Sequence, residues 1–92
     1  IGIVGKYENC DEAYLSLKEA CIHAGVQAEV KTNIKWINAE DLEKAEDLRS
    51  VWRNFQDVDG VIIPGGFDCR GVEGKLMATK YCREKKIPFL GI

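Results

Sequence analysis

Short apolar segments that alternate with longer amphipathic segments constrain the fold of this chain more than any other feature. Four segments carry β-branched and aromatic residues typical of strands, and three segments with helical periodicity separate them. The predicted strands cover residues 1–7, 30–38, 60–66 and 87–92, and the predicted helices cover residues 9–28, 39–60 and 71–86. Strands that alternate with helices form right-handed crossovers and a parallel sheet. We therefore predict an α/β fold with a doubly wound parallel sheet in the order β-α-β-α-β-α-β.

Apolar residues recur three and four positions apart in each predicted helix, which places them on one face. In the first helix, Gly25 is the expected C-terminal stop. The expected buried faces consist of Tyr14, Leu17, Cys21 and Ala24 in the first helix, Leu42, Ala45, Leu48, Trp52 and Phe55 in the second, and Met77, Ala78, Tyr81 and Cys82 in the third. In the second strand the expected apolar members are Val30, Ile34, Trp36 and Ile37.

Composition narrows the class of protein. The chain has 92 residues, which is enough for at most one small domain. Its formal net charge of −2 and pI near 5.4 give no basic surface that would attract nucleic acid or acidic membranes. No stretch reaches the roughly 18 apolar residues of a membrane span. The four cysteines show no C-x-x-C spacing and the only histidine is His23, so we predict no metal site. Reduced thiols in the cytoplasm, with Cys21 and Cys82 in the core, are expected.

Ligands of doubly wound sheets bind beyond the carboxyl ends of the strands, so the segments that follow the strands are the candidate sites. After the first strand, Gly2 and Gly5 are only two residues apart and Tyr7 follows Lys6, which fits neither a Walker loop nor a dinucleotide-binding turn. The first and third strands also lack the acidic residues of a receiver domain. The first exit is therefore interpreted as a simple strand-to-loop transition.

The third strand ends in Pro64-Gly65-Gly66, and a predicted helix follows shortly afterwards. Two glycines at this point leave backbone amides bare, and such amides form an oxyanion hole that contributes about 3 to 4 kcal/mol to acyl transfer. Alternatively, the two glycines merely allow a tight turn with positive φ. The spacing alone favours neither interpretation.

The residues after this glycine pair are either a ligand-facing loop or a solvated helix start. Arg70 and Glu73 carry the charges, and Gly71 and Gly74 punctuate the segment. Cys69 has the residue type of a nucleophile, but the sequence places no histidine or carboxylate beside it to activate the thiol.

Several motifs together resemble the glutamine amidotransferase domain of the CTP synthase family. They are "IGIVGKY" followed by "DEAYLSLKEACIHAG", then "IKWINAEDLE", "DGVIIPGGF" with "RGVEGK", and "REKKIPFLGI". The likeness covers nearly the whole chain. The Pro-Gly-Gly turn is shared by many class I amidotransferases, whereas "VGKY" and "RGVEGK" are more particular to CTP synthase. The resemblance implies a three-layer, flavodoxin-like fold.

The resemblance also implies a reaction. The family hydrolyses L-glutamine with a cysteine nucleophile and a His-Glu pair, and the ammonia aminates UTP to CTP with ATP and Mg²⁺, activated by GTP. Residues 1–92 are expected to form the N-terminal half of this domain and to end just before the nucleophile elbow, so that the cysteine would follow Ile92 and the chain alone would be inactive. A synthetase domain of the same polypeptide, a homotetramer and a cytoplasmic location are expected of the parent protein.

Two sets of residues match family roles. Gly65 and Gly66 match the turn that binds glutamine and serves the oxyanion, and Phe67, Arg70, Gly71 and Glu73 match the lid-like loop where GTP is expected. This chain has Asp68 where the family usually has glycine. The aspartate adds a negative charge beside the proposed nucleotide.

Two alternatives remain from the sequence. One is a non-catalytic, amidotransferase-like binding or regulatory module that keeps the Pro-Gly-Gly turn without a nucleophile. The other is a different class I glutamine amidotransferase. A cysteine after Ile92 would favour an enzyme over the binding module.

Overall fold

The computed structural model describes residues 1–5, 14–44, 47–65 and 71–92. Helices and strands alternate along the chain, as predicted. The strands are β1 (Gly2–Gly5), β2 (Lys35–Asn38), β3 (Val61–Ile63) and β4 (Phe89–Gly91), and the helices are α1 (Leu15–Gln27), α2 (Ala39–Glu43), α3 (Leu48–Asn54) and α4 (Val72–Lys85). No helix in these described ranges is both long and apolar enough to cross a membrane.

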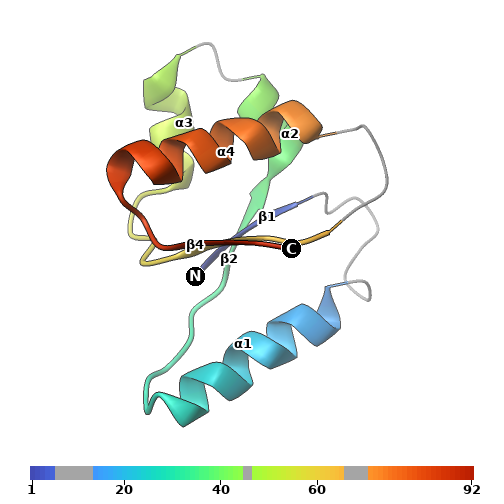
Figure 1. Ribbon diagram of the computed structural model, residues 1–92, viewed down its shortest axis with the longest axis vertical. Helices are drawn as coiled ribbons and strands as arrows, with labels where there is room; N and C mark the ends of the chain where they lie inside the picture. The colour runs from blue at the N-terminus through green and yellow to red at the C-terminus, as the bar shows by residue number, and fades with distance from the viewer. Residues whose placement is uncertain (6–13, 45–46, 66–70) are drawn as a thin grey trace.

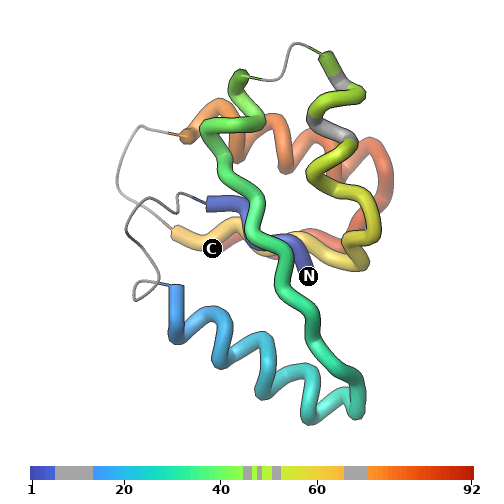
Figure 2. The backbone as a smooth tube through the Cα atoms, turned by 180° about the vertical axis from the view of Figure 1, so that it is seen from behind, coloured from blue at the N-terminus to red at the C-terminus, as the bar shows by residue number. Residues whose placement is uncertain are grey.

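The four strands form one parallel sheet in the order β2-β1-β3-β4 (Figure 1). Helices α2, α3 and α4 lie on one face of the sheet, and α1 lies on the other. Seen from behind, the same three layers are evident (Figure 2). The predicted doubly wound α/β fold is therefore confirmed. Because the chain moves from β1 towards β2 but from β3 towards β4, the topological switch point lies between β1 and β3.

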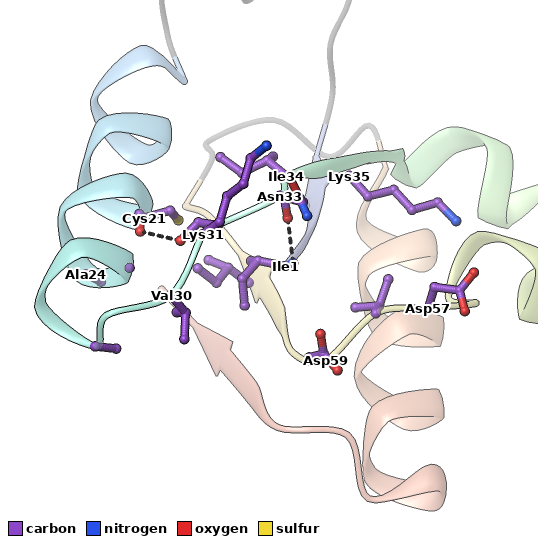
Figure 3. Close-up of a pocket in the computed structure, with 15 residues that line it drawn as sticks. Ile1, Cys21, Ala24, Val30, Lys31, Asn33, Ile34, Lys35, Asp57 and Asp59 are labelled. Carbon is purple, nitrogen blue, oxygen red and sulfur yellow. Dashed lines mark hydrogen bonds between the residues drawn. The ribbon is translucent and has the colours of Figure 1, made fainter.

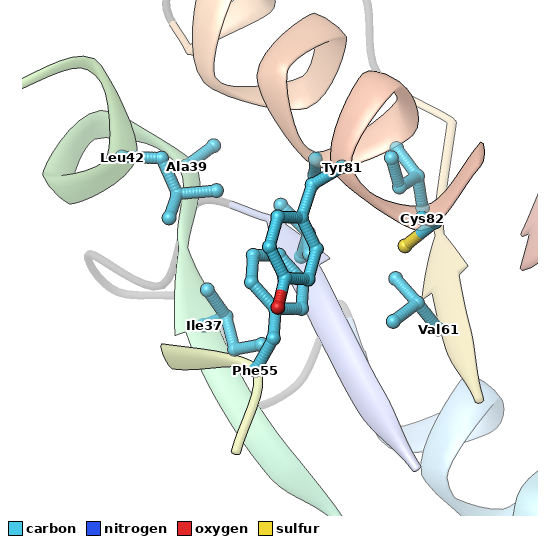
Figure 4. Packing of buried hydrophobic residues seen from close by; sticks show 10 residues of the cluster. Ile37, Ala39, Leu42, Phe55, Val61, Tyr81 and Cys82 are labelled. Atoms are coloured by element: carbon cyan, nitrogen blue, oxygen red, sulfur yellow. The ribbon is translucent and has the colours of Figure 1, made fainter. Parts of the chain in front are cut away.

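The core lies between the sheet and the layer of α2 and α4 (Figure 4). Aromatic rings from two segments stack at its centre: the ring centroids of Phe55 and Tyr81 are 4.9 Å apart and the rings are inclined by 22°. The buried cluster consists of Val4, Ile37, Ala39, Leu42, Phe55, Val61, Ile63, Ala78, Tyr81 and Cys82. It includes Ala78, Tyr81 and Cys82, which the periodicity of the third helix predicted.

The first helix differs from the prediction in its first residue and at Gly25. It begins at Leu15, and it continues through Gly25 to Gln27, so the predicted stop at Gly25 is wrong. The left-handed residue that ends this helix is Glu29, with φ of 59°. Gly25 lacks a side chain for a different reason: a Cβ atom there would overlap with the hydroxyl of Thr32, which packs against the helix.

The second predicted helix is also interrupted. Two helices, α2 and α3, take the place of a single helix over residues 39–60, and the buried ring of Phe55 follows the last residue of α3. The second strand is shorter than predicted and begins only at Lys35. Val30 lies outside it and is 62% exposed, whereas Ile37 is buried as predicted.

Candidate functional site

The ends of β1 and β3 lie side by side at the switch point, where a ligand of this fold class is expected. Tyr14 is the N-cap residue of α1, and its side chain lies at this point. A Cβ atom on Gly5 would lie 2.8 Å from the Tyr14 hydroxyl oxygen and 3.7 Å from Cγ of Pro64. The ring of Tyr14 also contacts that of Trp36, with centroids 5.9 Å apart. The sequence placed Tyr14 on the buried face of a helix, so its position at this edge was missed.

Gly65 follows β3 and is exposed. Among the described glycines only Gly71 has a positive φ, so the backbone at Gly65 does not require glycine. Among the described residues, a Cβ atom there would meet only the carbonyl oxygen of Ile92, at an ordinary contact distance of 3.6 Å. Within the described residues, neither a left-handed φ nor close packing accounts for the missing side chain of Gly65. The alternative of a turn with positive φ therefore does not hold at Gly65.

The carboxyl end of β4 emerges directly beside Gly65. Strands β3 and β4 pair in parallel, with Ile63 opposite Gly91, and the backbone N–H of Ile92 donates to the carbonyl oxygen of Ile63 over 2.9 Å. The bare backbone after β3 and the last residue of β4 consequently share one edge of the sheet.

The predicted lid residues are only partly described. Gly66, Phe67 and Arg70, together with Asp68 and Cys69, lie outside the described residues. Gly71 is buried at the N-cap of α4 with φ of 82° and ψ of 0°, a left-handed conformation that favours glycine. Glu73 is exposed in the first turn of α4, where the helix dipole favours a carboxylate.

The first turn of α4 packs tightly on α2. Gly74 is buried, and a Cβ atom on it would overlap with the carbonyl oxygen of Ala39. The backbone N–H of Gly74 donates to Oε1 of Glu43 over 3.2 Å. Sequence reasoning did not find Glu43, because its role depends on a partner 31 residues away that no local pattern indicates.

A cleft of about 580 Å³ lies at the opposite, amino-terminal edge of the sheet (Figure 3). It opens between α1 and the segments that lead into β2 and β3. Its polar contacts are internal: the ammonium group of Ile1 donates to the carbonyl oxygen of Asn33 over 2.8 Å, and the Thr32 hydroxyl donates to that of Cys21 over 3.2 Å. Ligands of doubly wound sheets bind at the carboxyl ends of the strands, so we assign the candidate site to the carboxyl edge.

The described thiols are part of the packing. Cys21 and Cys82 are both free and buried, which confirms the prediction that they are core residues. Burial raises the pKa of the Cys82 thiol, which keeps it protonated and unreactive. Within the described ranges no three His, Cys, Asp or Glu side chains come together as a metal site.

Similar proteins point to one family. Residues 10–92 match the family described as glutamine amidotransferase class-I. The CTP synthases of Methanocaldococcus jannaschii and Archaeoglobus fulgidus are 54% and 51% identical to this chain over its whole length, which spans 17% and 16% of theirs. Among solved structures, the glutaminase domain of Trypanosoma brucei CTPS with bound acivicin superimposes with a TM-score of 0.86 and 31% identity, covering 98% of this chain and 34% of that one.

The matched family covers most of the chain, and both CTP synthases match it over its whole length. The chain belongs to the class-I glutamine amidotransferase family, and the predicted resemblance to the CTP synthase glutaminase domain is confirmed.

Proposed function

We propose that this chain is part of the glutamine-hydrolysing domain of a CTP synthase and that Gly65 belongs to the cradle for the glutamine side chain. The observation that carries the proposal is exposed Gly65 beside the end of β4, where φ is not positive and the described neighbours leave room for a side chain. A bare amide at the carboxyl edge of a parallel sheet suits a substrate carbonyl that becomes an oxyanion.

The structural relative supports the choice of substrate. Acivicin, which is bound to the Trypanosoma brucei glutaminase domain, is a glutamine analogue. The superposition of this chain on that domain, with a TM-score of 0.86 over 98% of the chain, supports the same ligand here. L-Glutamine is therefore the proposed ligand of the carboxyl edge.

The proposed reaction is an acyl transfer through a thioester. The thiolate of the cysteine that is expected to follow Ile92 adds to the side-chain carbonyl carbon of glutamine. The carbonyl oxygen becomes an oxyanion that backbone N–H groups of the Gly65-Gly66 turn stabilise. Collapse of this intermediate breaks the C–N bond and, with a proton from the general acid, releases ammonia. Water then hydrolyses the thioester to glutamate and restores the thiol. The nucleophile and its His-Glu partners are those expected from the family.

The parent protein is proposed to use the ammonia for the ATP- and Mg²⁺-dependent amination of UTP to CTP, in a synthetase domain of the same polypeptide. GTP is the proposed activator, at the loop of Phe67 and Arg70 with Gly71 and Glu73 at its end. A homotetramer in the cytoplasm is proposed, and the two buried free thiols suit a reducing compartment.

The test is the Gly65→Ala variant of the parent protein. The described neighbours of Gly65 leave room for a methyl group, so the melting temperature is expected to stay at or slightly above that of the wild type. Glutamine hydrolysis is expected to fall by about 10-fold or more, because the methyl group blocks the approach to the backbone. The matched control is Thr32→Ala, at the amino-edge cleft, which should leave hydrolysis unchanged.

Each alternative gives a different result. A parent protein that binds glutamine without releasing ammonia is the non-catalytic module. One that releases ammonia but does not aminate UTP is another class I amidotransferase. Full glutaminase activity in Gly65→Ala would remove Gly65 from the proposed cradle.

A further inference from the structure

Helix α4 begins with a residue that cannot cap it. The first amide groups of a helix have no partner within the helix, and an N-cap side chain usually accepts from one of them. The N-cap of α4 is Gly71, whose φ of 82° suits glycine and which has no side-chain acceptor. By contrast, α2 caps itself, because Oδ1 of Asn38 accepts from the backbone N–H of Glu40 over 2.9 Å.

A carboxylate from the neighbouring helix supplies the missing cap. The N–H of Gly74, three residues after the N-cap, donates to Oε1 of Glu43, the last residue of α2. This is the amide that an N-cap side chain would normally serve, and a negative charge is favourable at this end of the helix dipole. The bond therefore ties the start of α4 to α2 as well as satisfying a donor.

Close backbone packing holds the two helices at the distance that this bond requires. Gly74 lies against the carbonyl group of Ala39, where any side chain would overlap. Ala39 directly follows β2, so the first turn of α4 is fixed to the carboxyl edge of the sheet. The segment between β3 and α4 therefore has two fixed ends: Gly65 at the end of β3, and the first turn of α4, which begins after Gly71.

We propose that Glu43 is a positioning residue for glutamine hydrolysis: its carboxylate oxygen caps α4 and so holds the far end of the segment that starts at Gly65. This inference rests on the proposed glutaminase function. It assigns no contact between Glu43 and glutamine. Its effect is on the placement of backbone donors, which act on the transition state more than on the bound substrate.

The experiment compares Glu43→Ala, Glu43→Gln and the control Asp41→Ala in the full-length parent protein, assayed for glutamine hydrolysis well below the melting temperature. Glu43→Ala is expected to lower kcat about 5- to 10-fold with KM for glutamine unchanged, because small misplacements of catalytic groups cost rate. Glu43→Gln keeps an acceptor oxygen and is expected to restore kcat to within about 2-fold. Asp41 is an exposed carboxylate on the same helix, and its loss should leave kcat unchanged.

The outcomes separate this inference from the function on which it rests. Wild-type kcat in Glu43→Ala would overturn the positioning role while the glutaminase function stands. The role would also be overturned by equal losses in Glu43→Ala and Glu43→Gln, or in Glu43→Ala and Asp41→Ala. An inactive wild-type protein would instead overturn the proposed function, and this inference with it.

Discussion

The two faces of the sheet are built very differently. On one face α2 and α4 enclose a cluster of ten buried residues, with the stacked rings of Phe55 and Tyr81 at its centre. On the other face α1 stands alone, and only Cys21 and Gly25 of this helix are buried. Leu15 and Val26 on α1 are 52% and 73% exposed, and Leu90 on β4 is 55% exposed.

This difference shows which interactions hold the described fold together. The covered face removes apolar side chains from water, and burial of this kind is the main favourable term in folding. The face of α1 leaves much of its apolar surface in water and contains the amino-edge cleft. We therefore expect substitutions on the covered face to cost much more stability than matched substitutions on the face of α1.

The largest expected contrast is between Phe55→Ala and Val26→Ala. Phe55 is 4% exposed, and the loss of its ring from a packed core should cost about 3 to 5 kcal/mol. Val26 is largely exposed, so its truncation should change the free energy of unfolding by about 0.5 kcal/mol or less. Urea denaturation of the parent protein, followed by tryptophan fluorescence, measures both. Similar costs for the two variants would mean that α1 is covered in the parent protein.

A smaller contrast is expected between two buried helical glycines, Gly74 and Gly25. In Gly74→Ala the new methyl group meets the backbone of Ala39, which cannot rotate away, so a cost of about 2 to 3 kcal/mol is expected. In Gly25→Ala the severe overlap is with the Thr32 hydroxyl, which can rotate, and the backbone carbonyl oxygen of Val30 is less crowded at 3.0 Å. Since alanine also favours a helix, the net cost there should be about 1 kcal/mol or less.

Melting temperatures of the two alanine variants rank these costs. A larger loss in Gly25→Ala would show that the segment after α1 is as rigid as the contact between α2 and α4.

Local periodicity predicted the parts of the fold that depend on neighbours three or four residues apart. The buried face of α4 was correct because Ala78, Tyr81 and Cys82 share it through helical spacing alone. The predicted helix stop at Gly25 was wrong because this position lacks a side chain for a tertiary reason: Thr32 packs against it. Trp36 is 41% exposed although the pattern placed it among the apolar residues of the strand, because β2 is at the edge of the described sheet.

The candidate site shows the same division. Gly65 stood out in the sequence because two glycines after a buried strand are a local signal. At Gly65, the choice between a left-handed turn and an open backbone required the φ angle, which the structure provides. Glu43 gave no signal at all, because one more acidic residue in an acidic helix is ordinary in sequence.

The smallest expected effect concerns the pH dependence of the covered face. Burial raises the pKa of the Cys82 thiol above its usual value of about 9.0, and burial, followed by the nearby Cys82, raises the pKa of Tyr81. A group with a raised folded-state pKa contributes stability that is complete below its unfolded pKa and is lost as pH rises through the folded value. Stability should therefore fall above about pH 9 as the unfolded state releases these protons first.

Replacing Cys82 isolates its part of this alkaline loss. Cys82→Ala creates a cavity whose cost does not depend on pH, so the informative quantity is the slope of the unfolding free energy between about pH 8 and pH 10. That slope should be shallower than in the wild type by less than one proton per molecule. Val61→Ala, in the same cluster without a titratable group, should keep the wild-type slope. Equal slopes in Cys82→Ala and the wild type would mean that the Cys82 thiol has the same pKa in the folded and unfolded chains. Water would then reach this thiol in the folded protein, contrary to its burial in the packed cluster.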